Sequence, residues 1–190
     1  MKINLHHVKE EFCGHLPYTI FSSACGITFV GILSFISILL EEQRLPMAAK
    51  ELFHVFHPIH LLLSATATTA MFWLHEKGLI KTIIIGFVGA VGVCGISDII
   101  IPFIGGVVLG VKMHLHICIL EHPQVILPFV GMGIFAGFIA SETIHRSTVF
   151  SHAGHVCVSS MASILYLVSF GLSEWMHKVG LVFVVIVIAV

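Results

Sequence analysis

Long apolar segments separated by short polar stretches dominate this sequence. An α-helix that crosses the hydrocarbon core of a bilayer needs about 20 mostly apolar residues. Four segments meet this length or come close to it: residues 16–40, 54–74, 124–140 and 151–172. A fifth apolar run covers residues 79–111, and residues 180–190 form a short sixth. We therefore predict an all-α, polytopic transmembrane helix bundle that forms a single integral membrane domain over residues 1–190.

The apolar run at residues 79–111 has an unusual length. At about 1.5 Å per residue it is long for one straight helix and short for two. Its middle reads ISDIIIPFIGG and contains Ser97, Asp98, Pro102 and a glycine pair. We interpret the run as two short spans that meet near Asp98, with a short broken linker helix at residues 98–111. The alternative is one span followed by a re-entrant segment.

These two interpretations give seven or six crossings, and the basic residues help to choose between them. Cytoplasmic loops of membrane proteins favour Lys and Arg. With seven crossings, six of the nine basic residues fall on the side of the N-terminus, whereas six crossings divide them five to four. We therefore predict about seven spans, with six as the alternative, in the cell (inner) membrane with a cytoplasmic N-terminus.

Two parts of the chain resemble each other. HPIHLLLSATAT at residues 57–68 and SHAGHVCVSSMAS at residues 151–163 both contain two histidines three apart, followed by a serine four residues later. WLHEKGL, which starts at Trp73, matches WMHKVGL, which starts at Trp175. We predict a duplicated three-helix unit. Its parts are a first repeat at residues 16–96, a linker helix or re-entrant segment at 97–112, and a second repeat at 124–190.

The predicted direction of the repeats affects the histidine pairs. In the seven-span arrangement the repeats run parallel, and both pairs lie on the same side of the membrane, where they can meet. In a six-span inverted arrangement we expect the two pairs to lie at opposite ends. Internal repeats are common in transporters, whose binding sites lie at the repeat interface.

Composition supports a membrane protein and directs attention to histidine. Hydrophobic residues make up 57% of the chain and charged residues 10%, whereas soluble domains carry about 25% charged residues. The net charge of −1 argues against a nucleic-acid partner, and we expect the lipid bilayer, with a homo-oligomer or larger membrane complex, instead. The 14 histidines outnumber the nine lysines and arginines. The five scattered cysteines include no CxxC pair, so we interpret them as small buried hydrophobes.

The paired histidines predict a metal site inside the membrane. Ionisable side chains are costly there and mark ion or substrate paths, and neutral imidazole is a common metal ligand. Residues three and four apart share one helix face, so each pair can present two ligands together. The predicted metal ligands are His57, His60, Asp98, His152 and His155. The predicted pathway or second site comprises Ser64, Thr68, His75, His116, Glu121, His122 and Ser159.

The leading functional interpretation is a transporter or channel for a divalent transition metal, with zinc or iron as the expected ion. One alternative is a membrane cytochrome or electron-transfer subunit, in which facing histidines such as His57 with His152, or His60 with His155, ligate haem b. Another is an intramembrane zinc-dependent hydrolase, with Asp98 or Glu142 as the base. We assign no catalytic residue and favour a non-enzymatic function.

Overall fold

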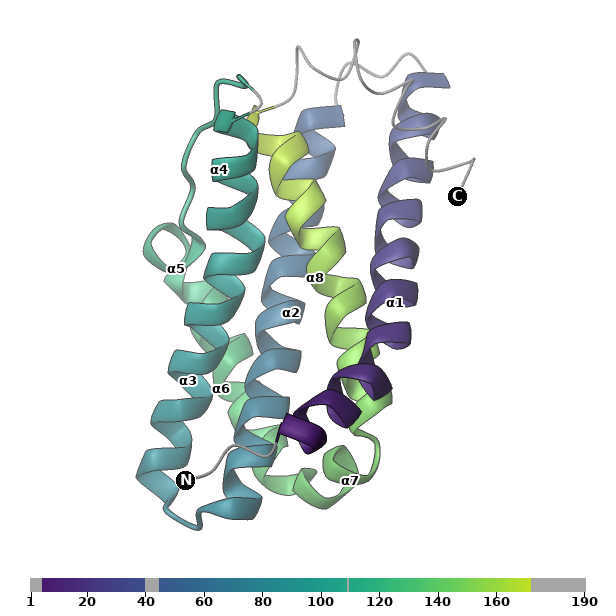
Figure 1. Cartoon of the computed structure of the whole chain (residues 1–190). Coiled ribbons are helices and arrows are strands. Elements are labelled where there is room, and N and C mark those ends of the chain that lie inside the picture. The colour runs from purple at the N-terminus through teal and green to yellow at the C-terminus, as the bar shows by residue number, and fades with distance from the viewer. Residues whose placement is uncertain (1–4, 40–44, 109, 172–190) are drawn as a thin grey trace.

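The structure, a computed structural model, describes residues 5–39, 45–108 and 110–171, and every regular element in these ranges is helical (Figure 1). The elements are α1 (Leu5–Leu39), α2 (Leu45–His75), α3 (Leu79–Gly95), the π-helical turn η1 (Ile96–Ile100), α4 (Ile101–Val108), α5 (Cys118–Glu121), α6 (Pro123–Ile139), α7 (Ser141–Arg146) and α8 (Thr148–Gly171). The predicted all-α class is confirmed. The predicted last span at residues 180–190 and the repeat segment at Trp175 lie outside the described residues.

Four helical segments are long and apolar enough to cross a membrane. They are Cys13–Leu33, Met47–His75, Leu79–Val108 and Thr148–Phe170. Helix α6 is also apolar but has only 17 residues. On α3, Ile80, Ile84 and Val88 recur every four residues and are exposed, as expected for a face that contacts lipid. The chain therefore has the helices of a polytopic membrane bundle.

Residues 79–108 form one continuous helical path, and the predicted division into two spans is wrong. Gly95, Ile96 and Ile101 all have right-handed helical backbone angles. Pro102 lacks an N–H, so the carbonyl of Asp98 loses its usual helical partner. The backbone widens here into a π turn, in which the Ile101 N–H donates to the Ile96 carbonyl. The polar residues thus mark a turn within one helix, and the seven-span count is not confirmed.

After α4 the chain turns back along the bundle without forming a long helix at first. Gly110 adopts a φ of 76°, a left-handed conformation that glycine accommodates readily. The His114 N–H donates to the Phe170 carbonyl over 3.0 Å. The Tyr166 hydroxyl accepts from the His116 N–H over 3.0 Å and donates to the His114 carbonyl over 3.2 Å. Helix α6 then continues to the end of the bundle where α1 begins (Figure 1), so this return path is discontinuous.

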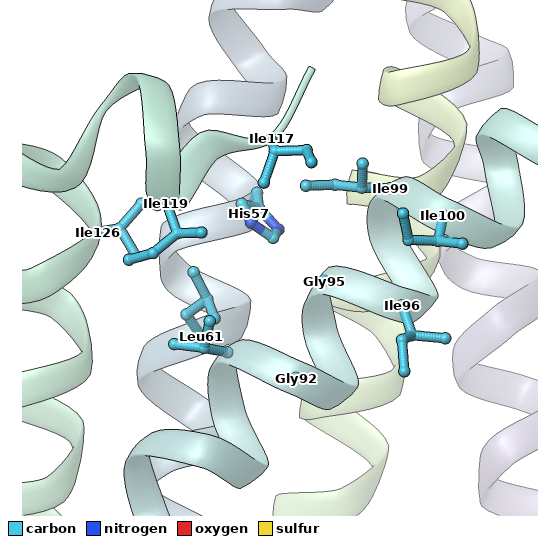
Figure 2. Close-up of a pocket in the computed structure, with 11 residues that line it drawn as sticks. His57, Leu61, Gly92, Gly95, Ile96, Ile99, Ile100, Ile117, Ile119 and Ile126 are labelled. Carbon is cyan, nitrogen blue, oxygen red and sulfur yellow. The ribbon is translucent and has the colours of Figure 1, made fainter. Parts of the chain in front are cut away.

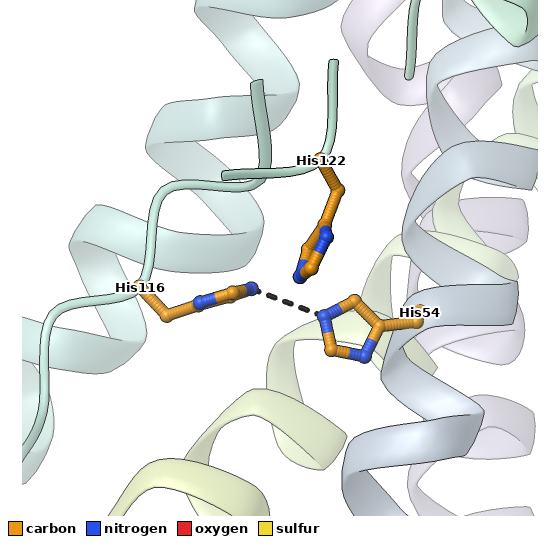
Figure 3. A group of neighbouring side chains, drawn as sticks. All are labelled: His54, His116 and His122. Atoms are coloured by element: carbon orange, nitrogen blue, oxygen red, sulfur yellow. Dashed lines mark hydrogen bonds between the residues drawn. The ribbon is translucent and has the colours of Figure 1, made fainter. Parts of the chain in front are cut away.

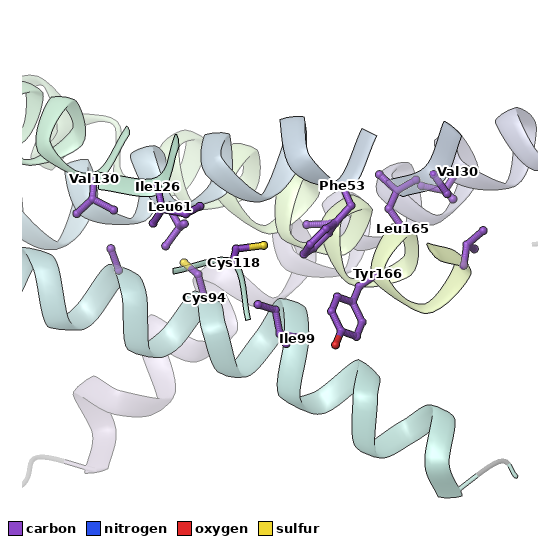
Figure 4. Packing of buried hydrophobic residues seen from close by; sticks show 14 of the residues in the cluster. Val30, Phe53, Leu61, Cys94, Ile99, Cys118, Ile126, Val130, Leu165 and Tyr166 are labelled. Carbon is purple, nitrogen blue, oxygen red and sulfur yellow. The ribbon is translucent and has the colours of Figure 1, made fainter. Parts of the chain in front are cut away.

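Helix α2 occupies the centre of the bundle and packs against α3, α6 and α8, while α1 packs against α8 (Figure 1). A cluster of buried apolar side chains, among them Phe53, Leu61 and Tyr166, fills the space between these helices (Figure 4). Thr69 of α2 lies between two glycines, Gly86 of α3 and Gly137 of α6. Small residues of this kind allow membrane helices to approach closely.

The close contact at Gly137 gives a stability prediction. A Cβ atom at this position would lie 2.7 Å from both the Thr66 carbonyl oxygen and the Thr69 Cβ. We expect Gly137→Ala to destabilise the protein by about 1–3 kcal/mol, because the added methyl group forces α2 and α6 apart. At Gly131, on the same helix, a Cβ would meet nothing within 4 Å. Thermal unfolding in detergent should show a lower midpoint for Gly137→Ala and no loss for Gly131→Ala; equal midpoints would contradict the packing described here.

Candidate metal centre

A buried polar cluster lies at the middle of three spans. Leu61 is the central residue of Met47–His75, and Ser159 is that of Thr148–Phe170, while Cys94 is next to the centre of Leu79–Val108. The polar side chains of this cluster lie within a few residues of these positions. A site at the middle of its helices lies close to the bilayer midplane, where transporters commonly bind their substrates.

Asp98, on the π turn, is the hydrogen-bonding centre of this cluster and is 0% exposed. Its Oδ2 atom lies 2.9 Å from His57 Nδ1 and 2.6 Å from His60 Nδ1. Its Oδ1 atom accepts hydrogen bonds from the Ser97 hydroxyl at 2.8 Å and the Ser159 hydroxyl at 3.0 Å. An ionised carboxylate only accepts, so both histidines donate through Nδ1–H. An imidazole with its one proton on Nδ1 has a lone pair on Nε2 that can bind a metal.

The Nε2 atom of His60 faces two further ligand atoms. His155 Nε2 of α8 lies 2.8 Å away, and Cys94 Sγ of α3 lies 3.6 Å away. These three residues form a group whose ligand atoms all lie within 4.8 Å of one another. Ligand atoms around a tetrahedral zinc ion lie roughly 3.3–3.6 Å apart, given Zn–N bonds of about 2.0 Å and Zn–S bonds of about 2.3 Å. The distance from the Cys94 sulfur to the His60 nitrogen therefore fits a shared zinc ion, and the two nitrogens, 2.8 Å apart, need to separate by about half an ångström.

The charge of Asp98 calls for a compensating cation. Among the described residues, its ion-pair partners are His57 and His60. A buried carboxylate is costly unless it is paired. Compensation must therefore come from a proton on an imidazole or from a cation bound at His60 Nε2. A carboxylate on Nδ1 of a histidine whose Nε2 binds metal is a common arrangement that fixes the tautomer and the ring orientation.

The bundle contains two cavities, one beside this cluster and one nearer the end of the bundle where α8 begins. The first, of about 190 Å³, has an apolar lining apart from His57 (Figure 2), and His57 is also hydrogen-bonded to Asp98. The ring of His57 also stacks on Phe53, with centroids 5.2 Å apart. The second cavity, of about 830 Å³, lies near the start of α8 and is lined in part by His15, His145 and Arg146. The cluster therefore borders an apolar cavity, and a larger cavity with polar and apolar lining residues lies further along α8.

The structure brings together one histidine from each predicted pair. His60 meets His155, although α2 and α8 run antiparallel, as the neighbouring pair Phe53 and Phe170 shows. We expected an antiparallel arrangement to separate the pairs, and this expectation is wrong because both pairs lie near mid-span rather than at the helix ends.

The second histidine of each pair has another environment. His57 contacts Asp98 rather than the other ligand atoms. His152 faces α1, where its Nε2 lies 3.0 Å from Thr19 Oγ1 and its ring lies 5.4 Å from that of His15. The predicted set of four converging imidazoles does not form, because residues three apart on a helix differ in direction by about 60°.

The predicted pathway residues separate into four locations, three of which are occupied by Ser64 with Ser159, by Thr68 and by His75. Ser64 is buried next to the cluster, and Ser159 contributes a hydrogen bond to Asp98. Thr68 packs against α3 at Gly89 instead of lining a path. His75 lies at the end of α2, where its Nδ1 lies 2.8 Å from the Met71 carbonyl oxygen.

The remaining predicted residues, His116, Glu121 and His122, gather around a histidine that was not among the predicted ligands, His54. Cys94 was also missed as a ligand, because we interpreted the cysteines as buried hydrophobes. Its thiol is buried, but it points at the Nε2 atom of His60.

Comparisons with models of protein families, with curated proteins and with solved structures gave no match for this chain. The function proposed below is therefore inferred from the geometry of the side chains.

Proposed function

We propose that this protein is a membrane transporter for a divalent transition metal, and that His60, Cys94 and His155 bind the ion near the middle of the bilayer. The observation that carries the proposal is the convergence of two imidazole nitrogens and one thiol sulfur from three helices. Asp98 is hydrogen-bonded to the other nitrogen, Nδ1, of the His60 imidazole. Mixed nitrogen and sulfur ligands suit zinc, which takes this set in many proteins.

Features of the fold favour transport over a fixed structural ion. Structural zinc sites have four protein ligands, whereas three ligands leave a position open for exchange. The site lies beside a π turn, an irregularity that is frequent at functional sites. The return path between α4 and α6 is discontinuous, as are many helices that line transporter sites.

The larger cavity gives the ion an aqueous approach from one end of the bundle. Its lining combines polar side chains such as His15 and His145 with apolar ones such as Phe150, and it reaches Ala153 on α8, within one turn of His155. We call the group of His60, Cys94 and His155 the midplane site, and we infer that metal passes between this cavity and the midplane site.

The distribution of charge suggests which end faces the cytoplasm. Basic residues concentrate in cytoplasmic segments. Among the described residues, the end at which α1 begins carries Lys9, Lys77, Lys81 and Arg146, and the other end carries Lys50 and Lys112. We therefore propose that the polar cavity opens to the cytoplasm.

The same geometry disfavours the two alternative functions. The nitrogens of His60 and His155 are 2.8 Å apart, which leaves no room for an iron atom and a planar macrocycle between them. The carboxylate of Asp98 already accepts four hydrogen bonds, so none of its lone pairs is free to take a proton from a metal-bound water. Glu142, the other candidate base, is exposed on α7.

A flux measurement tests the proposal. Purified protein reconstituted in liposomes that enclose a zinc-sensitive dye should take up zinc, and His155→Ala should lower the initial rate at least tenfold. His75→Ala is the matched control and should keep the wild-type rate, because this imidazole is exposed, lies at the end of α2 away from the cluster and bonds to the carbonyl of Met71 in its own helix. Liposomes with wild-type protein that take up zinc no faster than empty ones would overturn the transport function.

A further inference from the structure

A second group of histidines lies one to two helical turns along α2 from the midplane site (Figure 3). His54 comes from α2, His116 from the extended return segment, and His122 from the residue that precedes α6. The Nε2 atoms of His54 and His116 are 3.0 Å apart, and the three ring centroids lie 5.0–5.5 Å from one another. One ligand atom from each ring lies within 4.8 Å of the other two. Segments far apart in the sequence therefore direct three imidazoles at one point.

The His116 imidazole is held in a fixed orientation. Its Nδ1 atom lies 2.8 Å from the Oε2 atom of Glu121, which leaves Nε2 facing the other two rings. The ring stacks on Phe170, with centroids 4.7 Å apart and planes 14° apart. The backbone N–H of the same residue donates to the Tyr166 hydroxyl. The relation of Glu121 to His116 repeats that of Asp98 to His60, in which a carboxylate orients one imidazole towards other ligands.

We propose that His54, His116 and His122 form a second binding site for a divalent transition metal, separate from the midplane site. His54 precedes His60 by six residues, or about 9 Å along the helix. Three imidazoles and no thiol suit zinc, cobalt or nickel. The side chain of Glu121 is half exposed, so water can reach the cluster and occupy the fourth position. This inference does not depend on transport, because the two sites share no ligand.

A bound ion here would also fasten the return segment to α2. Hydrogen bonds through Tyr166 and Phe170 attach the segment to α8, and the His116 ring contacts Phe53 and His54 of α2. A metal that binds one histidine from α2 and two from the return path adds a connection between them, and ligands that bind only the native state raise its stability.

Cobalt binding to the full-length protein in detergent tests this inference. We expect the wild type to bind two equivalents of Co²⁺, measured by equilibrium dialysis and elemental analysis. His122→Ala should bind one equivalent and keep the thiolate-to-cobalt charge-transfer band of the Cys94 site. His155→Ala should also bind one equivalent but should lack this band.

The outcomes separate the two sites. A single wild-type equivalent that disappears in His122→Ala would support the second site and overturn the midplane site. Undiminished binding in His122→Ala would overturn the second site. Glu121→Gln keeps all three histidine ligands and serves as a second test variant in case His122→Ala does not fold. It should retain two equivalents while the affinity of one falls about tenfold, as for other residues that orient a metal-binding histidine; unchanged affinity would count against the proposed role of Glu121 and hence against the site.

Discussion

Replacement of Asp98 by asparagine is expected to lower the affinity of the midplane site for zinc by about 10- to 100-fold. The Asp98 carboxylate accepts a hydrogen bond from His60 Nδ1 at 2.6 Å and places a negative charge beside the ligands of the ion. An asparagine amide is neutral, so the charge that favours a bound cation is lost. Competition with a chromogenic chelator, in the His122→Ala background that removes the second site, measures this affinity.

Ser159→Ala is the control for the Asp98 variant. It removes one hydrogen bond to the opposite carboxylate oxygen, Oδ1, but keeps the charge and both histidine contacts. We expect the zinc affinity of Ser159→Ala to fall only a few-fold, in line with the net value of a single hydrogen bond. If Asp98→Asn elutes as a folded protein and binds zinc as tightly as the wild type, Asp98 does not orient a metal ligand.

Cys94→Ser is expected to eliminate the thiolate-to-cobalt charge-transfer band of the loaded protein and to weaken binding at the midplane site by at least tenfold. The hydroxyl of serine is a much poorer ligand for this class of metal than a thiolate. Cys157→Ser is the matched control, because Cys157 lies where α8 packs against Gly26 of α1, away from the cluster. The charge-transfer bands of the two cobalt-loaded variants are compared by absorption spectroscopy. A band that survives in Cys94→Ser and vanishes in Cys157→Ser would show that another thiol binds the ion.

Several features of this fold could be predicted from the sequence. The apolar segments indicated the helical class, because long runs of low charge are typical of membrane-spanning helices. The histidines three apart indicated His60 and His155, since ionisable groups within spans rarely face lipid. Asp98 was identified for the same reason, although as a metal ligand and not as the carboxylate that orients His57 and His60.

Other features depended on tertiary structure. Hydropathy does not distinguish a π turn inside one span from a break between two, so the segment around Pro102 was divided incorrectly. The contact of His60 with His155 depends on how the antiparallel helices α2 and α8 are shifted along their axes relative to each other. No local sequence pattern determines this axial register. The internal duplication stays a prediction, because its second tryptophan, Trp175, lies outside the described residues.

Two missed ligands had signals in the sequence. His54 precedes His57 and His60 at the same spacing of three, in HVFHPIH. Cys94 belongs to a series of mostly small residues with a spacing of four, which marks the inner face of α3: Thr82, Gly86, Ala90, Cys94 and Asp98. Such a series predicts that the cysteine and the aspartate face the same helix, and this places the thiol beside the histidines of α2.

X-ray absorption at the zinc edge tests the central claim most directly. Zinc-loaded His122→Ala protein contains only the midplane site, so its spectrum reports the ligands of that ion. We predict one sulfur ligand at about 2.3 Å together with nitrogen or oxygen ligands at about 2.0–2.1 Å. The sulfur contribution should vanish when Cys94→Ser is added. A zinc ion surrounded only by nitrogen and oxygen in the His122→Ala protein, or no bound zinc at all, would contradict a metal centre built from His60, Cys94 and His155.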